Sequence, residues 1–156
     1  MGLQRIGHVV LNVRDLAASQ AFYVDVVGMQ VREAMAGAAF LTCGEAHHDV
    51  ALVQARSGQE QPPAGRPLHG RTGLNHVMLW TESVDDVRAT YRRLKAAGDE
   101  SARPIDHGSV RSIYFLDPDG NTVEVGYEVP AELRVADHIP GRMAWDVEAE
   151  PVAANS

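Results

Sequence analysis

One pattern occurs twice in this chain, and it constrains the fold more than any other feature. An apolar segment containing His8 is followed by a helix-like stretch with Tyr23, and both residues recur 68 positions later as His76 and Tyr91. In each copy a helix-capping residue precedes the stretch and a glycine follows it. Agreement in strand, cap, helix and terminal glycine indicates an internal duplication.

The first copy predicts a strand, a helix and three further strands. Val9, Leu11 and Val13 alternate with residues of the opposite face, which is typical of a strand over 6–13. Asp15 can cap a helix over 16–27 that Gly28 ends. Short strand-like pieces follow over 30–35, 38–42 and 49–54.

The second copy predicts the same succession. A strand over 74–81 leads to Ser83, which can cap a helix over 84–97 with Gly98 just past its end. Strands are then expected over 101–105, 110–116 and 122–127. The sequence therefore predicts an α+β fold, in which two tandem βαβββ modules form one curved, half-open barrel sheet with the helices outside.

The length of 156 residues suits one compact domain. We expect this domain to cover 1–128, with modules at about 6–56 and 73–128 and a Pro- and Gly-rich linker at 57–72. The remaining residues, 129–156, predict an irregular C-terminal arm because they contain Pro130, Pro140 and Gly141. The alternation of Met143, Trp145 and Val147 would let this arm dock on the body or on a second subunit.

Charge and cysteine content exclude several classes of protein. A formal net charge of −7 argues against a nucleic-acid surface, which needs a basic stripe. Cys43 is the only cysteine, so neither an intramolecular disulfide nor a thiolate metal cluster is expected. The N-terminus has no long apolar run, which predicts a cytoplasmic protein without a membrane partner.

Three residues form a candidate metal site. His8 and His76 occupy the same point of the first strand in their modules, on the face opposite the aliphatic residues. Glu124 stands in an apolar strand, where a carboxylate is costly unless it is paired, hydrogen-bonded or bound to a metal. Two imidazoles and one carboxylate suit non-haem Fe(II), while manganese, nickel and zinc stay open by ligand type alone.

The two βαβββ halves with His8, His76 and Glu124 resemble the vicinal oxygen chelate superfamily over residues 6–128. This superfamily includes glyoxalase I, fosfomycin and bleomycin resistance proteins, methylmalonyl-CoA epimerase and type I extradiol dioxygenases. Glyoxalase I places a fourth ligand, a glutamate, at the position that Ala51 occupies when the repeats are aligned. Alanine cannot ligate, so the resemblance implies a coordination site left for substrate or oxygen.

The stretch 105–124 is similar to the extradiol ring-cleavage signature from end to end. We expect the turn Asp117-Pro118-Asp119-Gly120-Asn121 to reverse the chain, with His107 and Tyr114 on or just before one strand and Glu124 on the next. The resemblance implies that His107 and Tyr114 hydrogen-bond a catecholate oxygen while Glu124 binds the metal.

The segment 47–52 resembles the family segment that carries an acid–base histidine, best matched by His48. An imidazole there can accept a catechol proton and return it later in the reaction. Strict alternation from Ala51 places His47 on the cavity side instead, unless a bulge or a strand beginning after His48 intervenes. Met78 and Trp80 share the face of His76 and are either the wall of an aromatic pocket or ordinary core.

The resemblance thus implies an Fe(II)-dependent extradiol dioxygenase, with Mn(II) or another divalent metal as the alternative cofactor. Its substrates would be a small aromatic diol and O2, and a homodimer is expected. The alternatives are another three-ligand enzyme of the superfamily, such as an epimerase or a fosfomycin-type transferase, and a metal-free drug-binding resistance protein. The enzyme alternatives have no need of His48, His107 and Tyr114 together. A metal-free binding protein has no need of the ligands His8, His76 and Glu124.

Overall fold

The computed structural model describes residues 5–56, 73–134 and 138–149. The chain divides into two compact units, 1–64 and 65–156, and each is described on its own. The predicted linker at 57–72 lies outside the described residues. Each unit contains one of the predicted modules, and each module has its own hydrogen-bonded sheet, which confirms the α+β fold of two tandem βαβββ modules.

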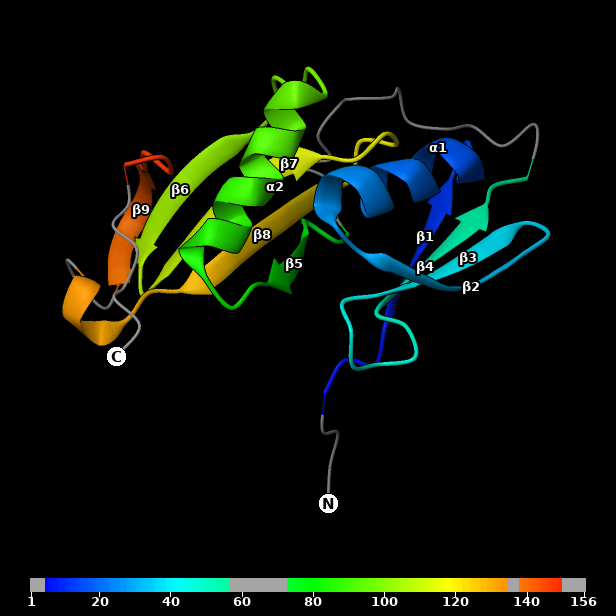
Figure 1. Ribbon diagram of the computed structural model, residues 1–156, viewed down its shortest axis with the longest axis horizontal. Coiled ribbons are helices and arrows are strands. Elements are labelled where there is room, and N and C mark those ends of the chain that lie inside the picture. Colours follow the sequence, from blue (N-terminus) through cyan, green and yellow to red (C-terminus); the bar gives the residue numbers. More distant parts are fainter. Residues whose placement is uncertain (1–4, 57–72, 135–137, 150–156) are drawn as a thin grey trace. The chain divides into compact units, whose positions relative to one another are not determined.

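The first unit has a mixed four-stranded sheet in the order β1-β4-β3-β2 (Figure 1). β1 runs parallel to β4, and the other neighbours are antiparallel. The helical segment lies against β3 and β4. The element bounds are β1 Val9–Val13, α1 Leu16–Ala21, η1 Phe22–Val27, β2 Gln30–Met35, β3 Ala38–Thr42 and β4 Val50–Gln54.

The helix of the first unit has the predicted ends but not a uniform geometry. Asp15 caps it by accepting a hydrogen bond from the Ala18 amide, and Gly28 ends it with φ 99°. Between them the α-helix α1 passes into the π-helical segment η1. Among the helices in the described ranges, none combines the length and the apolar character needed to cross a membrane.

The second unit has a five-stranded sheet in the order β5-β8-β7-β6-β9. Its first helix, α2, begins after the cap Ser83, as predicted. β5 is parallel to β8, and the remaining pairs are antiparallel. The element bounds are β5 Val77–Trp80, α2 Val84–Ala96, β6 Arg103–Gly108, β7 Val110–Leu116, β8 Thr122–Glu128, η2 Ala131–Leu133 and β9 His138–Ala144.

The strand registers of the two sheets correspond position by position. In the first sheet Val10 and Phe40 are both partners of Ala51. In the second sheet Met78 and Tyr114 are the partners of Glu124. Since Val10 follows His8 as Met78 follows His76, the duplication extends to the pairing of the strands, and Ala51 occupies the place of Glu124.

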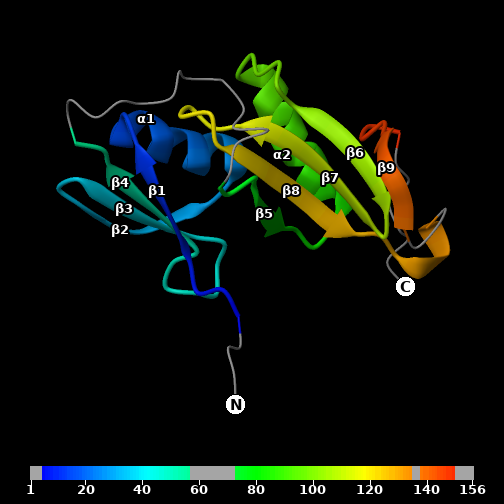
Figure 2. The ribbon, with the colours of Figure 1, turned by 180° about the vertical axis from the view of Figure 1, so that it is seen from behind.

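The two faces of the second sheet differ in burial. α2 packs against β7 and β8, and viewed from behind these strands lie in front of it (Figure 2). Alternate residues of these strands form an almost fully buried apolar layer: Ile113, Phe115, Val123 and Val125. The residues between them, which include Tyr114 and Glu124, belong to the other face. This face carries the candidate site.

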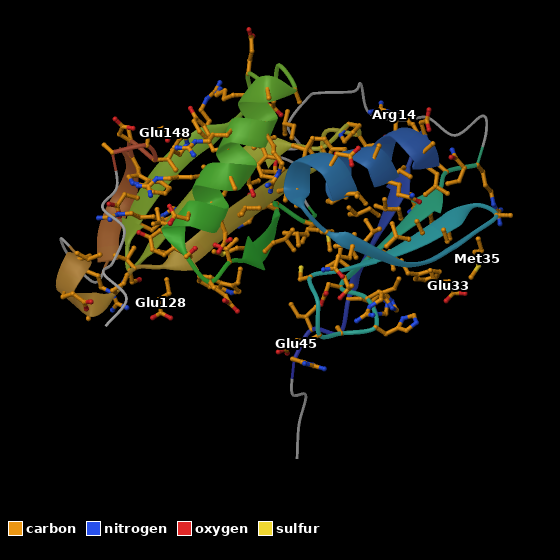
Figure 3. All side chains as sticks on the ribbon, in the orientation of Figure 1. Arg14, Glu33, Met35, Glu45, Glu128 and Glu148 are labelled. Atoms are coloured by element: carbon orange, nitrogen blue, oxygen red, sulfur yellow. The ribbon has the colours of Figure 1, made fainter. Side chains whose placement is uncertain are left out.

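The C-terminal arm is more regular than the sequence predicts. Instead of an irregular segment, β9 extends the second sheet by pairing with β6, despite its proline and glycine. Trp145 and Val147 are then buried, and the Val147 carbonyl accepts a hydrogen bond from Arg88 Nε of α2 (2.9 Å). Glu148 (labelled in Figure 3) is hydrogen-bonded to Arg92 of the same helix. The arm therefore docks on the body of its own chain; the Met143 side chain lies outside the described part.

Candidate metal centre and substrate-binding residues

Glu124 and His76 form the central pair of the candidate site. Glu124, on β8, is only 4% exposed, and its Oε2 lies 2.9 Å from Nε2 of His76, which immediately precedes β5. The other oxygen, Oε1, accepts a hydrogen bond of 2.6 Å from the Ser112 hydroxyl. The parallel pairing of β5 with β8 brings His76 and Glu124 together.

The chemistry of this pair fits a divalent cation. His76 Nδ1 lies 2.9 Å from Asn75 Oδ1, so the ring donates its Nδ1 hydrogen to the amide oxygen. If Nε2 carries no hydrogen, it presents a lone pair toward the carboxylate oxygen Oε2, 2.9 Å away. Two such electron-pair donors in contact require a cation or a proton between them. With Nε2 and Oε2 2.9 Å apart, His76 and Glu124 would both hold the ion.

The third predicted ligand, His8, belongs to the first unit. Within the described ranges, no group of three His, Cys, Asp or Glu side chains is gathered closely enough to hold an ion. The structure thus brings together two of the three predicted ligands. The contribution of His8 stays a prediction.

Tyr114 lies beside the His76–Glu124 pair. It is the direct partner of Glu124 between β7 and β8, where opposing side chains are in contact. Its ring meets His76 edge-on, with ring centroids 5.4 Å apart, and its hydroxyl is 3.2 Å from His107 Nε2. His107, Tyr114, His76 and Glu124 therefore form one cluster on one face of the second sheet.

His107 does not lie on or just before the strand of Tyr114, as the sequence predicts, but on the preceding strand, β6. Gly108, with φ 95°, ends β6 at a tight turn, and β7 begins two residues later. Asp106 organises this turn by accepting hydrogen bonds from the Gly108 amide (2.7 Å) and from Arg111 Nε (2.7 Å). This buried ion pair between Asp106 and Arg111 was not predicted from the sequence. The sequence signal for it is Asp106, a carboxylate directly before His107.

The turn that precedes Glu124 is formed as predicted. Asp117 accepts hydrogen bonds from the amides of Asp119 (2.9 Å) and Asn121 (2.8 Å), and Gly120 has φ 86°. This turn fixes the register between β7 and β8. The placement of Tyr114 opposite Glu124 follows from that register.

The acid–base candidate His48 belongs to a histidine cluster in the first unit. Its ring packs against His8, with ring centroids 4.6 Å apart, and edge-on against Phe40 at 5.1 Å. His48 is half-buried, whereas His47 is exposed, and their Nδ1 atoms are 3.0 Å apart. Because β4 begins at Val50, strict alternation does not extend back to the two histidines. The alternation argument for His47 therefore does not apply, and the choice of His48 stays a prediction.

Thr42 and Asp49 hold the loop that carries these histidines. Asp49 Oδ2 accepts hydrogen bonds from the Cys43 amide (2.7 Å) and the Thr42 hydroxyl (3.1 Å). Although Cys43 as a whole residue is exposed, burial around its sulfur and then the charge and hydrogen bonding of Asp49 raise the pKa of the thiol. Cys43 therefore stays protonated at neutral pH and is not an activated nucleophile.

Met78 and Trp80 differ in exposure. Met78, the partner of Glu124 on β5, is half-buried. Trp80 is 59% exposed, which rules out the core interpretation for this residue. Both share the strand parity of His76, so the site face carries apolar surface at its β5 side.

The fold and the site together define the class of protein. The sequence profile of the glyoxalase/bleomycin resistance protein/dioxygenase superfamily matches residues 5–125, and the chain belongs to this family. Biphenyl-2,3-diol 1,2-dioxygenase 3 of Rhodococcus globerulus is 36% identical to it over 123 residues, 78% of this chain and 62% of the relative. An iron-dependent extradiol dioxygenase of Rhodococcus jostii (strain RHA1) is 29% identical over 147 residues, 81% of this chain and 44% of the relative.

The solved structures agree on the fold. A glyoxylase/bleomycin resistance protein/dioxygenase domain from Frankia sp. EAN1pec superposes with a TM-score of 0.64 at 22% identity, covering 82% of this chain and all of that one. The chain spans 62% of the length of the Rhodococcus globerulus relative and 44% of the length of the Rhodococcus jostii relative. These matches confirm the family resemblance drawn from the sequence.

Proposed function

We propose that this chain is an Fe(II)-dependent extradiol dioxygenase that opens the ring of a catechol-type substrate with O2. The observation that carries the proposal is the cluster of His76, Glu124, Tyr114 and His107 on one face of the second sheet. The names of the relatives, which are diol dioxygenases, support the same reaction class. The partners are then a small aromatic diol and O2, in a cytoplasmic homodimer without nucleic-acid or membrane partners.

Iron would be held by His8, His76 and Glu124. The opposed electron-pair donors of His76 and Glu124 support a cation at this point. Nitrogen and carboxylate donors suit Fe(II), and the iron-dependent relative supports that choice over Mn(II) or another divalent ion. When bound, such an ion supplies the electronic connection between an aromatic diol and dioxygen.

Tyr114 and His107 would hold the substrate. The phenol and the imidazole are joined by their hydrogen bond and lie next to Glu124. A deprotonated diol oxygen beside Glu124 can accept a hydrogen bond from either group, which stabilises its negative charge. The apolar surface of Met78 and Trp80 on β5 is suited to the aromatic ring.

His48 would move the proton. An imidazole can act first as a general base and then as a general acid, so His48 would accept the hydroxyl proton of the diol and return it as the ring opens. Its half-buried position against His8 and Phe40 fixes the orientation of the ring. His47 next to it is exposed and is assigned no role in the reaction.

The experiment is oxygen consumption by the anaerobically Fe(II)-loaded chain with a panel of catechols, while the visible spectrum is followed for a yellow product. We expect uptake with at least one catechol. The His48→Ala variant should keep its iron and lose about 10²–10⁴-fold in kcat, the usual contribution of general acid–base catalysis. The exposed neighbour offers a matched control, because His47→Ala should retain both iron and turnover.

A His48→Ala variant with full activity would overturn the acid–base role while leaving the reaction class intact. Tight iron binding without oxygen uptake from any catechol would overturn the dioxygenase proposal. In that case the epimerase and transferase reactions are the next to test.

A further inference from the structure

Ser112 makes the shortest hydrogen bond to the candidate metal ligand Glu124. Its side chain is fully buried, and its hydroxyl donates to Oε1 of the carboxylate over 2.6 Å. Oε2 is the oxygen that faces His76 Nε2. The two carboxylate oxygens therefore have different partners, and one of them is occupied before any ion binds.

The room for Ser112 comes from a glycine on the neighbouring strand. Gly126 is the direct partner of Ser112 between β7 and β8. A Cβ atom added to Gly126 would lie 2.6 Å from Ser112 Cβ and 2.9 Å from the Arg111 carbonyl oxygen, and neither contact is sterically allowed. Only glycine lets the serine take this position beside Glu124.

The first module provides an internal comparison, because it has the same strand pairing without the carboxylate. The register places Ala51 where the second module has Glu124. In the same register Ala38 replaces Ser112 and Val53 replaces Gly126. The first module therefore has neither a hydroxyl at the position of Ser112 nor a glycine at the position of Gly126, and it also has no carboxylate at the position of Glu124. This joint replacement ties Ser112 and Gly126 to Glu124 rather than to the general packing of the sheet.

We propose that Ser112 is a positioning residue for metal binding, and that Gly126 gives it the space to act. The Ser112 hydroxyl fixes Oε1 of Glu124 and leaves Oε2, beside His76, as the oxygen that binds a divalent cation. This inference rests on the metal centre of the proposed function. It adds a residue that does not itself touch the ion.

The test measures Mn(II) binding by the chain of 156 residues, since Mn(II) is stable in air and its EPR spectrum reports its ligands. Ser112→Ala should weaken Mn(II) binding by about 10–100-fold, the usual effect of removing a hydrogen bond to a metal ligand. It should also change the EPR spectrum of the Mn(II) that still binds. Gly126→Ala should act in the same direction, because it displaces a serine that is still present.

Thr122→Val is the matched control. Thr122 lies on the same strand as Glu124 and is buried, and within the described residues its hydroxyl has no hydrogen-bond partner. Removing this hydroxyl should leave both the Mn(II) affinity and the EPR spectrum at their wild-type values. The comparison separates loss of the Ser112–Glu124 hydrogen bond from loss of a buried hydroxyl group as such. Equal effects of Ser112→Ala and Thr122→Val on Mn(II) binding would overturn the role of Ser112.

Glu124→Gln separates failure of the inference from failure of the metal centre. If Glu124→Gln loses Mn(II) but folded Ser112→Ala binds it with wild-type affinity and spectrum, the role of Ser112 is overturned and the centre stands. If Glu124→Gln itself binds Mn(II) as the wild type does, the centre and the inference both fall. Should Gly126→Ala not fold, Ser112→Ala alone decides.

Discussion

At the scale of single residues, the chemistry of the candidate site depends on how each polar side chain is paired. Glu124 is buried in a strand flanked by Val123 and Val125, and a carboxylate in such a place needs partners for both oxygens. Ser112 is the partner of one oxygen and His76 of the other. In the proposed metal centre, this pairing would leave Oε2 of Glu124 beside His76 as the oxygen that binds the cation.

Tyr114→Phe tests the substrate-binding role at this scale. The variant loses the hydroxyl that is hydrogen-bonded to His107 but keeps the ring that packs on His76. Iron content should therefore be unchanged, while kcat/KM for a catechol should fall by about 10²–10³-fold, as when one donor to a developing anion is removed. Loss of iron together with activity would show that Tyr114 instead supports the metal ligands.

The sequence reveals the identity of most candidate residues but not their pairing. His76, His107, Tyr114 and Glu124 follow from the repeat and the signature, and the structure brings all four into one cluster. Ser112 was not predicted, because a serine in a strand has no distinguishing pattern until the register sets it near a carboxylate. The place of His107 on β6 was missed because the turn at Gly108 is only one residue long between the strands.

At the scale of elements, helix ends and turns fix the registers that assemble the site. α2 ends in a Schellman motif: the Gly98 amide donates to the Lys95 carbonyl (3.0 Å) and the Asp99 amide to the Leu94 carbonyl (2.9 Å). Gly98 takes up the left-handed conformation that this ending needs, with φ 77°. The predicted stop of the helix is confirmed at this residue.

Gly98→Ala should destabilise the protein by about 1 kcal/mol, because an L side chain is strained at this backbone conformation. A Cβ at this position would meet no atom within 4 Å, so the cost would come from the backbone alone. Urea unfolding would measure it. Gly7 also has open space around the position of a Cβ atom, but its φ is not positive, so Gly7→Ala should leave the urea midpoint unchanged. Equal effects of the two variants would refute the conformational explanation.

Element boundaries were predictable where periodicity and turn residues agree. β2, β3 and β7 have the predicted bounds, and the caps at Asp15 and Ser83 are formed. The π-helical geometry of η1 was not predictable, because α- and π-helices differ by one residue in hydrogen-bond register and share the same side-chain preferences. β9 was missed because Pro140 and Gly141 disfavour a strand, although an edge position tolerates them.

At the scale of the whole molecule, a duplication has produced two modules that share a strand register but not a chemistry. The second module has Glu124 and Tyr114 where the first has Ala51 and Phe40. The second module also gains β9, which pairs with β6, and Val147 and Glu148 after it, which accept hydrogen bonds from Arg88 and Arg92 of α2. The curated relatives named above are longer than this chain, so its activity has to be measured directly.

Trp145→Ala tests whether the arm is an integral part of the second unit. Trp145 is 9% exposed and packs near Tyr127, with ring centroids 6.3 Å apart. Truncating it should destabilise the protein by about 3 kcal/mol, as for other large buried aromatic residues. Glu148→Gln, an exposed change in the same segment, is the control and should not move the thermal unfolding midpoint. Equal stability of Trp145→Ala and wild type would mean that the arm does not dock in solution.

The most direct test of the proposed ring cleavage is to measure the stoichiometry and the product of one reaction. Fe(II)-loaded protein is mixed with a catechol and O2, oxygen consumption is recorded, and the product is identified by mass spectrometry. We predict one O2 consumed for each catechol and a ring-opened product that contains both added oxygen atoms, with the ring broken beside the two hydroxyl-bearing carbons. Three results obtained while iron is bound would contradict the proposed reaction: cleavage between those two carbons, oxidation of the catechol to a quinone, or unchanged catechol.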